Sequence, residues 1–185
     1  DFADVVLTGG TGRSGTTVVG KLLSRHHEVK LARPTEIKFL TSGNGLLDLV
    51  HNPRFTRGGK LIWGRNANYR RFEGDVLNKW WKRNGKKGGQ SGLHQGIDEV
   101  SLKELLSTLE TELKSNRSIA SANFMRSFID YQMQGVESRY WLDTTPPNLM
   151  RADEIVRLMP GVRFIHMIRD GRDVSSSVVR ELWGP

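Results

Sequence analysis

The sequence predicts an α/β fold that has a central parallel sheet and a helical insertion. Two observations lead to this class. Predicted strands alternate with predicted helices at both ends of the chain, while the middle is mostly helical. A glycine-rich turn, GGTGRSGTT at residues 9–17, connects the first strand to the first helix. This turn makes the expected fold P-loop-like, with three layers, and the 185 residues are expected to form a single domain.

The amino-terminal half is expected to begin with two strands that flank a helix. Short apolar runs bounded by glycine or proline predict the strands, and apolar residues at helical spacing predict the helices. In order, the expected elements are a strand at 4–8, a helix at 16–25, a strand at 29–32, an interrupted helix at 36–50, a loop at 55–64 and a helix at 69–83.

The carboxyl-terminal half carries clearer boundary signals. Ser101 and Glu104 form a capping-box pattern, and Asn148 follows two prolines in a position to cap a helix. The glycine-rich segment 85–96 is expected to hold no regular element. The other expected elements are helices at 101–114 and 121–134, a strand at 140–143, a helix at 149–159, a strand at 162–168 and a helix at 172–182.

Charge and composition restrict the partners without choosing among them. Lys and Arg number 28 against 20 Asp and Glu, a net charge of +8 that suits polyanionic ligands or simply a well-solvated surface. There is no cysteine, which excludes disulfides and favours a reducing compartment such as the cytoplasm. No stretch of the sequence has the length and apolarity of a membrane span.

The segment 9–17 nearly matches the triphosphate loop G-x-x-x-x-G-K-[ST]. Gly10 and Gly15 fit this pattern, but Thr16 stands where the lysine belongs. A glycine-rich turn before a helix exposes N–H groups that bind a phosphate, whereas the lysine bridges the β- and γ-phosphates. The absence of this lysine predicts a ligand that lacks a β- and γ-phosphate pair. Arg13 can bind one charged group at the 5′ position of such a ligand. The alternative is a tight turn that binds nothing.

A second anion site is predicted from RFIHMIRDGRDVSSSVV, residues 163–179. Arg169 follows the strand at its carboxyl end, where open α/β sheets bind ligands, and Ser177 lies on the next helix. Two anion pockets at neighbouring strand ends fit a nucleotide that is phosphorylated in two places. The alternative is a solvated charge cluster at a helix end, formed by Arg169, Asp170, Arg172 and Asp173.

Together these segments resemble the sulfotransferase family, which uses 3′-phosphoadenosine 5′-phosphosulfate (PAPS) as donor and releases 3′-phosphoadenosine 5′-phosphate (PAP). GTGRSGTT is similar to the family's 5′-phosphosulfate loop, and FIHMIRDGRDVSSS to its 3′-phosphate motif. WLDTTPPNLMRADEIVRLMPGVRFI resembles bacterial members and the carbohydrate sulfotransferase-like branch. The resemblance implies that the donor is held by Gly12, Arg13, Ser14, Gly15, Thr16 and Thr17 at its 5′ end and by Arg169 and Ser177 at its 3′-phosphate.

The same resemblance suggests candidates for the catalytic groups. Sulfuryl transfer needs a base that takes the proton of the hydroxyl or amine acceptor as it attacks in line. Glu36 lies where several branches place a catalytic Glu, although it also suits the first turn of a helix. Asp143 in LDTTPP is the second candidate, beside Thr144, where other branches have His or Lys; its alternative role is strand-end hydrogen bonding. Arg13 is the third candidate catalytic residue.

No metal is expected, because the histidines lack metal-ligand spacing, no acidic cluster suits Mg²⁺, and the family mechanism needs no metal. The expected acceptor is a carbohydrate, a lipid or a small metabolite, in a pocket shaped by the helical middle and residues 84–96. Relatives continue beyond the 3′-phosphate motif, so we expect a bacterial sulfotransferase domain at 1–185 that is incomplete at its carboxyl end, with no nucleic-acid partner. Two other functions stay open: a P-loop kinase or other nucleotide phosphotransferase, and a basic nucleic-acid-binding module that uses KWWKR at 79–83.

Overall fold

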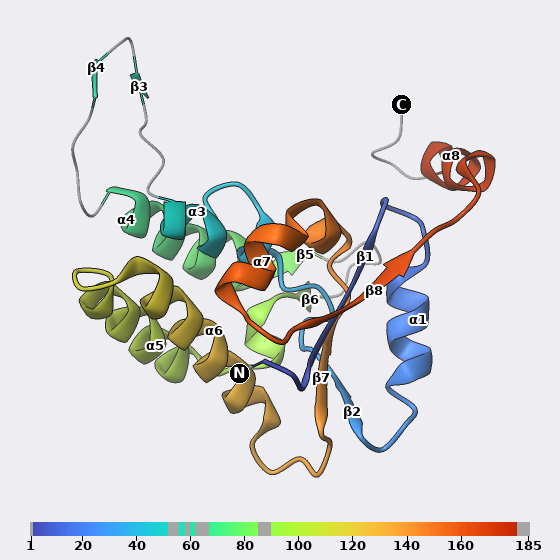
Figure 1. Ribbon diagram of the computed structural model, residues 1–185, viewed down its shortest axis with the longest axis horizontal. Coiled ribbons are helices and arrows are strands. Elements are labelled where there is room, and N and C mark those ends of the chain that lie inside the picture. Colours follow the sequence, from blue (N-terminus) through green and yellow to red (C-terminus); the bar gives the residue numbers. More distant parts are fainter. Residues whose placement is uncertain (1, 52–55, 58–59, 62–66, 85–89, 181–185) are drawn as a thin grey trace. The chain divides into compact units, whose positions relative to one another are not determined.

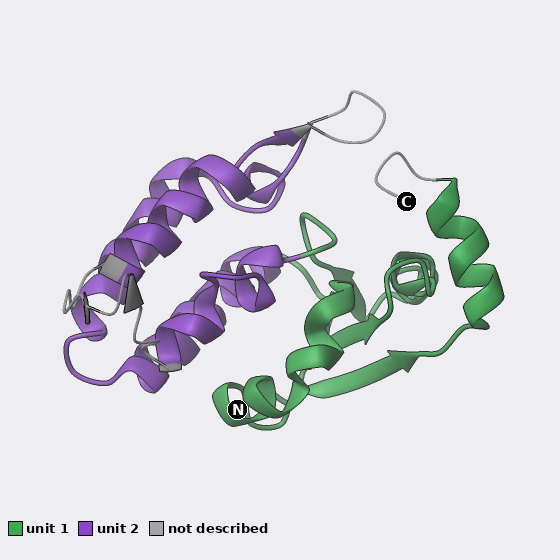
Figure 2. Cartoon of the chain, turned by 90° about the horizontal axis from the view of Figure 1, so that it is seen from above, with its two compact units in different colours: residues 1–36, 135–185 green, residues 37–134 purple. Residues whose placement is uncertain are grey.

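The computed structural model describes residues 2–51, 56–57, 60–61, 67–84 and 90–180. The chain divides into two compact units, drawn in green and purple in Figure 2. Unit 1 combines both ends of the chain, 1–36 and 135–185, and unit 2 is the segment 37–134 between them. Unit 2 corresponds to the helical insertion that the sequence predicts.

A four-stranded parallel sheet forms the centre of unit 1, which confirms the predicted α/β class. The strand order is β2-β7-β1-β8, and every neighbouring pair is parallel. The bounds of the strands are Val5–Gly10 for β1, Val29–Leu31 for β2, Tyr140–Asp143 for β7 and Arg163–Met167 for β8. Since all four run the same way, the segments that follow them meet at one edge of the sheet.

Helices cover both faces of this sheet. The connection from β1 to β2 crosses the sheet in one direction and that from β7 to β8 in the other, so right-handed crossovers place their helices on opposite faces. Figure 1 shows α1 and α7 on the two sides. The helical segments of unit 1 are α1 (Thr16–Leu23), the 3-10 helix η3 (Pro146–Arg151), α7 (Ala152–Leu158) and α8 (Gly171–Val179).

The core of unit 1 lies along the two central strands. Val5 and Leu7 on β1 and Trp141 and Leu142 on β7 are almost fully buried, as expected for strands covered on both faces. Strand β8 lies at the end of the sheet order and is only partly covered, and none of the residues of α8 is buried. The sheet therefore provides a rigid centre for the loops that leave its carboxyl edge.

Unit 2 is mostly helical and has an aromatic core. Phe39 contacts Phe72, Phe124 and Phe128 edge to face, with ring centroids 6.2, 5.6 and 5.1 Å apart, a favourable arrangement of aromatic pairs. Its helices are α2 (Lys38–Thr41), α3 (Leu46–His51), α4 (Ala67–Gly74), the π-helix η1 (Asp75–Trp80), the 3-10 helix η2 (Leu93–Gln95), α5 (Glu99–Glu112) and α6 (Arg117–Met133). Two short antiparallel pairs are formed by β3 (Thr56–Arg57) with β4 (Lys60–Leu61) and by β5 (Arg83–Asn84) with β6 (Gln90–Ser91).

The predicted capping box at the start of α5 is wrong. Asp98, not Ser101, is the N-cap: its Oδ1 accepts hydrogen bonds from the N–H groups of Val100 at 2.9 Å and Ser101 at 3.0 Å. The Ser101 hydroxyl and the Tyr131 hydroxyl both donate to the other carboxylate oxygen, at 2.7 and 2.6 Å. These hydrogen bonds, that of Tyr131 first, hold the pKa of Asp98 well below its usual range.

Other boundaries also differ from the sequence prediction. Asn148 does not cap a helix, because η3 spans it and α7 begins at Ala152. The segment 85–96 was predicted to have no regular element, but β6 and η2 lie within it; likewise β3 and β4 lie within the predicted loop at 55–64. Residues 85–89 lie outside the described residues, as do 181–185 at the end of the last predicted helix. Helix α6 begins at Arg117, earlier than predicted, because Asn116 caps it.

Replacing Asp98 with alanine should lower the melting temperature by several degrees at neutral pH, because α5 loses its cap and its link to α6. Circular dichroism melting measures this. The pKa of Asp98 is lowered by folding, so its contribution is present above about pH 4 and is lost as the pH falls towards the folded pKa. Glu104→Ala is the control: a larger loss for Glu104→Ala than for Asp98→Ala would restore the predicted capping box.

Candidate active site

The glycine-rich loop between β1 and α1 has the backbone shape of an anion-binding turn. Ser14 N–H donates to the carbonyl of Thr11 at 3.1 Å, and both Arg13 (φ 70°) and Gly15 (φ 101°) are left-handed. A side chain at Gly10 would come within 2.5 Å of the Met167 carbonyl oxygen, so glycine lets this loop pass close to the end of β8. The loop therefore lies beside the strand that leads to Arg169.

The amino end of α1 is open to a ligand. Gly15 is its N-cap, and among the described residues no side chain caps it and no acid lies in its first turn. Its N–H groups and partial positive charge are thus available to an anion. Ser14 is 5% exposed, and its hydroxyl has no hydrogen-bond partner in the part of the chain that the structure describes. A buried hydroxyl without a partner is costly, so the Ser14 hydroxyl is available to donate to a ligand at this turn.

The two segments that the sequence singles out are in direct contact. Arg13 Nε donates to the hydroxyl of Ser177 on α8 at 2.8 Å, although the two residues are 164 positions apart. Arg169 Nη1 donates to the carbonyl of Arg13 at 3.1 Å. The side chain of Arg13 therefore extends from the loop to α8, and three predicted donor-binding residues form one hydrogen-bonded group.

The charged residues at the start of α8 have separate roles. Asp170 is the N-cap, accepting from the N–H of Arg172 at 2.8 Å, and its two oxygens also accept from the Arg172 guanidinium at 3.1 and 2.8 Å. The guanidinium of Arg172 lowers the pKa of Asp170. Arg169 Nε lies 3.8 Å from Asp173 Oδ2. This ion pair is exposed and therefore contributes little to the stability of the fold. Asp170 and Arg172 thus pair with each other at the helix end, whereas Arg169 pairs with Asp173 and also reaches the carbonyl of Arg13 on the glycine-rich loop.

Asp143 is at the centre of a buried polar cluster at the end of β7. It is fully buried, and its carboxylate accepts from the Thr145 N–H at 3.2 Å, the Thr145 hydroxyl at 2.9 Å and Asn148 Nδ2 at 2.7 Å. Asn148 Nδ2 also lies 3.3 Å from the Thr8 carbonyl on β1. The cluster therefore ties η3 to the ends of both central strands. Asn148 was predicted only as a helix cap, whereas the structure places it in this cluster; its position five residues after a strand-end acid was the available signal.

Thr144 holds the chain next to the first candidate base. Its N–H and its hydroxyl both donate to the carbonyl of Thr35, at 2.9 and 2.7 Å. Glu36 is half-buried and precedes α2, which begins at Lys38, so it does not lie in the first turn of a helix. Glu36 follows β2 and the glycine-rich loop follows β1, with β7 between the two strands, so both segments leave the carboxyl edge of the sheet.

His94 and Trp80 of unit 2 have structural partners. His94 donates from Nδ1 to the Trp81 carbonyl at 2.7 Å. Trp80 is 4% exposed, with the Lys79 ammonium 5.4 Å from its ring centroid. The KWWKR segment thus buries Trp80 in unit 2, so this ring is not available for stacking on a ligand.

The buried cluster predicts the effect of one substitution on stability. Asp143→Asn should lower the free energy of unfolding by about 1.5–3 kcal/mol, the usual value of hydrogen bonds to a charged group. The NH₂ group of the new asparagine would also face the donor groups of Thr145 or Asn148, which would leave these donors without an acceptor. Urea titration measures the change, with the exposed Asp153→Asn as control, since its ion pair with Arg157 is on the surface. Equal stability of the two variants would contradict the structural role.

Comparison with known proteins identifies the family. The sulfotransferase family profile matches residues 6–184. A solved structure, sulfotransferase STF9 from Mycobacterium avium, is similar at 13% identity and a TM-score of 0.45, over 97% of this chain and 46% of that chain. This chain thus spans about half the length of STF9. A search of curated proteins gave no match.

No helix in the described part of the chain is long and apolar enough to span a membrane. The family profile extends over almost the whole sequence and includes both the glycine-rich loop and the segment with Arg169 and Ser177. The chain belongs to the sulfotransferase family, a group of transferases whose donor is PAPS.

Proposed function

We propose that unit 1 binds PAPS and transfers its sulfuryl group to a hydroxyl or amine of an acceptor. The observation that carries this proposal is the contact between Arg13 and Ser177, with Arg169 on the Arg13 carbonyl. It joins the glycine-rich loop and the α8 segment into one basic site at the carboxyl edge of the sheet. A donor with charged groups at its 5′ and 3′ positions needs two anion subsites of this kind side by side.

The loop and the start of α1 would hold the 5′-phosphosulfate. Backbone N–H groups from Gly12 to Thr17 lie on this turn, and Ser14 offers a hydroxyl that has no other partner among the described residues. When bound, PAPS supplies an activated sulfuryl group, and PAP is the product. Charge is balanced in this proposal by the helix end and by Arg13, without a metal.

Arg13 would serve both subsites. Its backbone belongs to the 5′ loop, whereas its guanidinium lies at Ser177, beside the expected 3′-phosphate. A cation in this position neutralises the donor where its two anionic groups come nearest. Arg13 would also replace the lysine of triphosphate loops. It lies three positions before the lysine position, and its guanidinium reaches Ser177 on α8.

Glu36 would take the proton of the acceptor. It is half-buried and is held at the carboxyl edge by the hydrogen bonds between Thr144 and Thr35. Asp143, by contrast, is fully buried and accepts three hydrogen bonds from Thr145 and Asn148. Burial therefore favours Glu36 as the group that contacts the acceptor and gives Asp143 a positioning role.

The donor site is tested by comparing PAP with adenosine 5′-monophosphate, which lacks the 3′-phosphate. Arg169→Ala should weaken PAP binding by roughly ten- to over a hundredfold, because a charged hydrogen bond contributes about 1.5–3 kcal/mol. Binding of the monophosphate should change little. Isothermal titration calorimetry in the presence of EDTA gives both affinities.

Arg172→Ala is the matched control, since Arg172 lies on the same turn but pairs with Asp170. It should leave PAP binding near the wild-type value. Equal losses for both nucleotides in Arg169→Ala would show that Arg169 supports the loop and not the 3′-phosphate. Binding of ATP that requires Mg²⁺, without binding of PAP, would replace the sulfotransferase proposal with a kinase.

The base is tested by Glu36→Gln, which keeps the size of the side chain. Turnover should fall by about 10²–10⁴, the usual contribution of a general base, while PAP affinity and melting temperature stay close to wild type. Turnover of Asp143→Asn should be measured below its melting transition. Near-normal turnover in Glu36→Gln, together with its loss in folded Asp143→Asn, would move the base to Asp143.

A further inference from the structure

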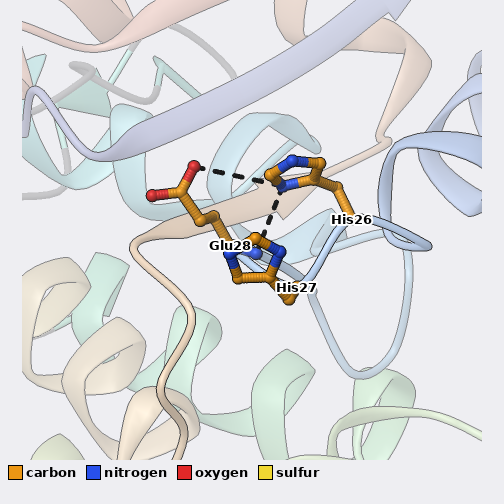
Figure 3. Close-up of side chains that lie close together, drawn as sticks. All are labelled: His26, His27 and Glu28. Atoms are coloured by element: carbon orange, nitrogen blue, oxygen red, sulfur yellow. Dashed lines mark hydrogen bonds and ion pairs between the residues drawn. The ribbon is translucent and has the colours of Figure 1, made fainter.

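Two histidines and a glutamate lie close together in the turn that leads from α1 to β2. The rings of His26 and His27 are stacked, with centroids 4.6 Å apart and planes at 26°. Glu28 Oε2 lies 4.0 Å from His26 Nδ1 (Figure 3). One ligand atom from each of the three residues lies within 4.8 Å of the others. Both imidazoles are exposed, so the group is accessible from solvent.

The backbone of this turn is fixed by hydrogen bonds to all three carbonyls. Val29 N–H donates to the carbonyl of His26 at 3.0 Å, the Ser138 hydroxyl to that of His27 at 2.7 Å, and Tyr140 N–H to that of Glu28 at 2.7 Å. The last two bonds come from the segment that leads into and starts β7. The three Cα positions are therefore set by the sheet, and only side-chain torsions remain to be ordered by a ligand.

We propose that His26, His27 and Glu28 bind one divalent transition-metal ion, with Zn²⁺ as the reference ion. Two imidazoles and a carboxylate are a ligand set typical of Zn²⁺, and Ni²⁺ and Cu²⁺ also prefer imidazole nitrogen. Water can fill the remaining coordination position because the turn is exposed. The carboxylate and the ion would also offset each other's charge.

The side chains must rotate to form this site, while the backbone can stay as it is. Tetrahedral Zn²⁺ with bonds of about 2.0–2.1 Å needs nitrogen and oxygen ligands about 3.3 Å apart, against the present limit of 4.8 Å. The stacked rings do not yet point their lone pairs at a common point, so at least one ring must turn. His26 Nδ1 accepts only a long hydrogen bond, 3.3 Å from Glu28 N, and a metal ion would replace it.

No metal was expected from the sequence, because the histidines lack metal-ligand spacing. A tight turn at the start of a strand, and not a helix, brings them together. The turn lies at the amino ends of β2 and β7, whereas the candidate active site lies at the carboxyl ends. An ion in this position would hold together the three side chains of the turn between α1 and β2. It would not take part in donor binding.

Calorimetric titration of Zn²⁺ into EDTA-treated, untagged protein tests the proposal. We expect one ion per chain. Removing a hydrogen-bond partner of a metal ligand lowers the metal affinity by about 10–100-fold, and removing the ligand itself should cost at least as much. His26→Gln and His27→Gln should therefore each weaken Zn²⁺ binding by at least about tenfold. His166→Gln, a matched loss of an exposed histidine on β8, should leave the affinity unchanged. Electron paramagnetic resonance of the Cu²⁺ complex should show two nitrogen ligands.

Absence of Zn²⁺ binding at millimolar concentration would overturn the proposal. So would full binding in the His26→Gln/His27→Gln double variant, since the ion would then lie elsewhere. The melting temperature of each variant without metal shows whether a loss of binding comes from unfolding. PAP binding should be the same with Zn²⁺ and with EDTA; a donor affinity that depends on Zn²⁺ would contradict the structural role of the ion.

Discussion

One buried carboxylate organises the edge of the sheet on which the candidate active site is built. Asp143 accepts hydrogen bonds from Thr145 and Asn148, and Asn148 also reaches the carbonyl of Thr8. The ends of β7 and β1 are thereby held together at the point where one strand leads into η3 and the other into the glycine-rich loop. Burying a charge is costly unless it accepts hydrogen bonds, and the donors of Thr145 and Asn148 offset that cost for Asp143.

The neighbouring contacts extend that arrangement across the sheet. On one side, Thr144 binds the Thr35 carbonyl and so places Glu36 beyond β2. On the other, β8 leads to Arg169, which binds the Arg13 carbonyl, while Arg13 itself reaches α8. The same four strands thus position Glu36, the glycine-rich loop and the segment that carries Arg169 and Ser177. A reaction between two substrates needs such a fixed frame, because misplacement by about 1 Å is costly in rate.

Two predicted helix starts are wrong, because a nearby carboxylate pairs with the residue that was expected to cap the helix. Ser101 and Glu104 match a capping box, but Asp98 has a second partner in Tyr131 on α6 and begins the helix earlier. Asn148 matches an N-cap, but it is recruited by Asp143. Ser101 pairs with Asp98 and Asn148 with Asp143, carboxylates only three and five positions away. Distant segments add a second contact in each place, from Tyr131 to Asp98 and from Asn148 to the Thr8 carbonyl, and a local pattern cannot reveal those contacts.

The sequence by itself determined the parallel α/β class and the position of the glycine-rich loop, and it predicted the two segments expected to bind anions, because apolar periodicity, glycine spacing and short motifs are local properties. Only the tertiary structure decided that Arg13 meets Ser177 and that Asp143 is buried while Glu36 is half-exposed. It also decided that His26, His27 and Glu28 form a cluster. These facts depend on strand order and on the direction of side chains after a turn, and both are settled by packing between segments more than a hundred residues apart.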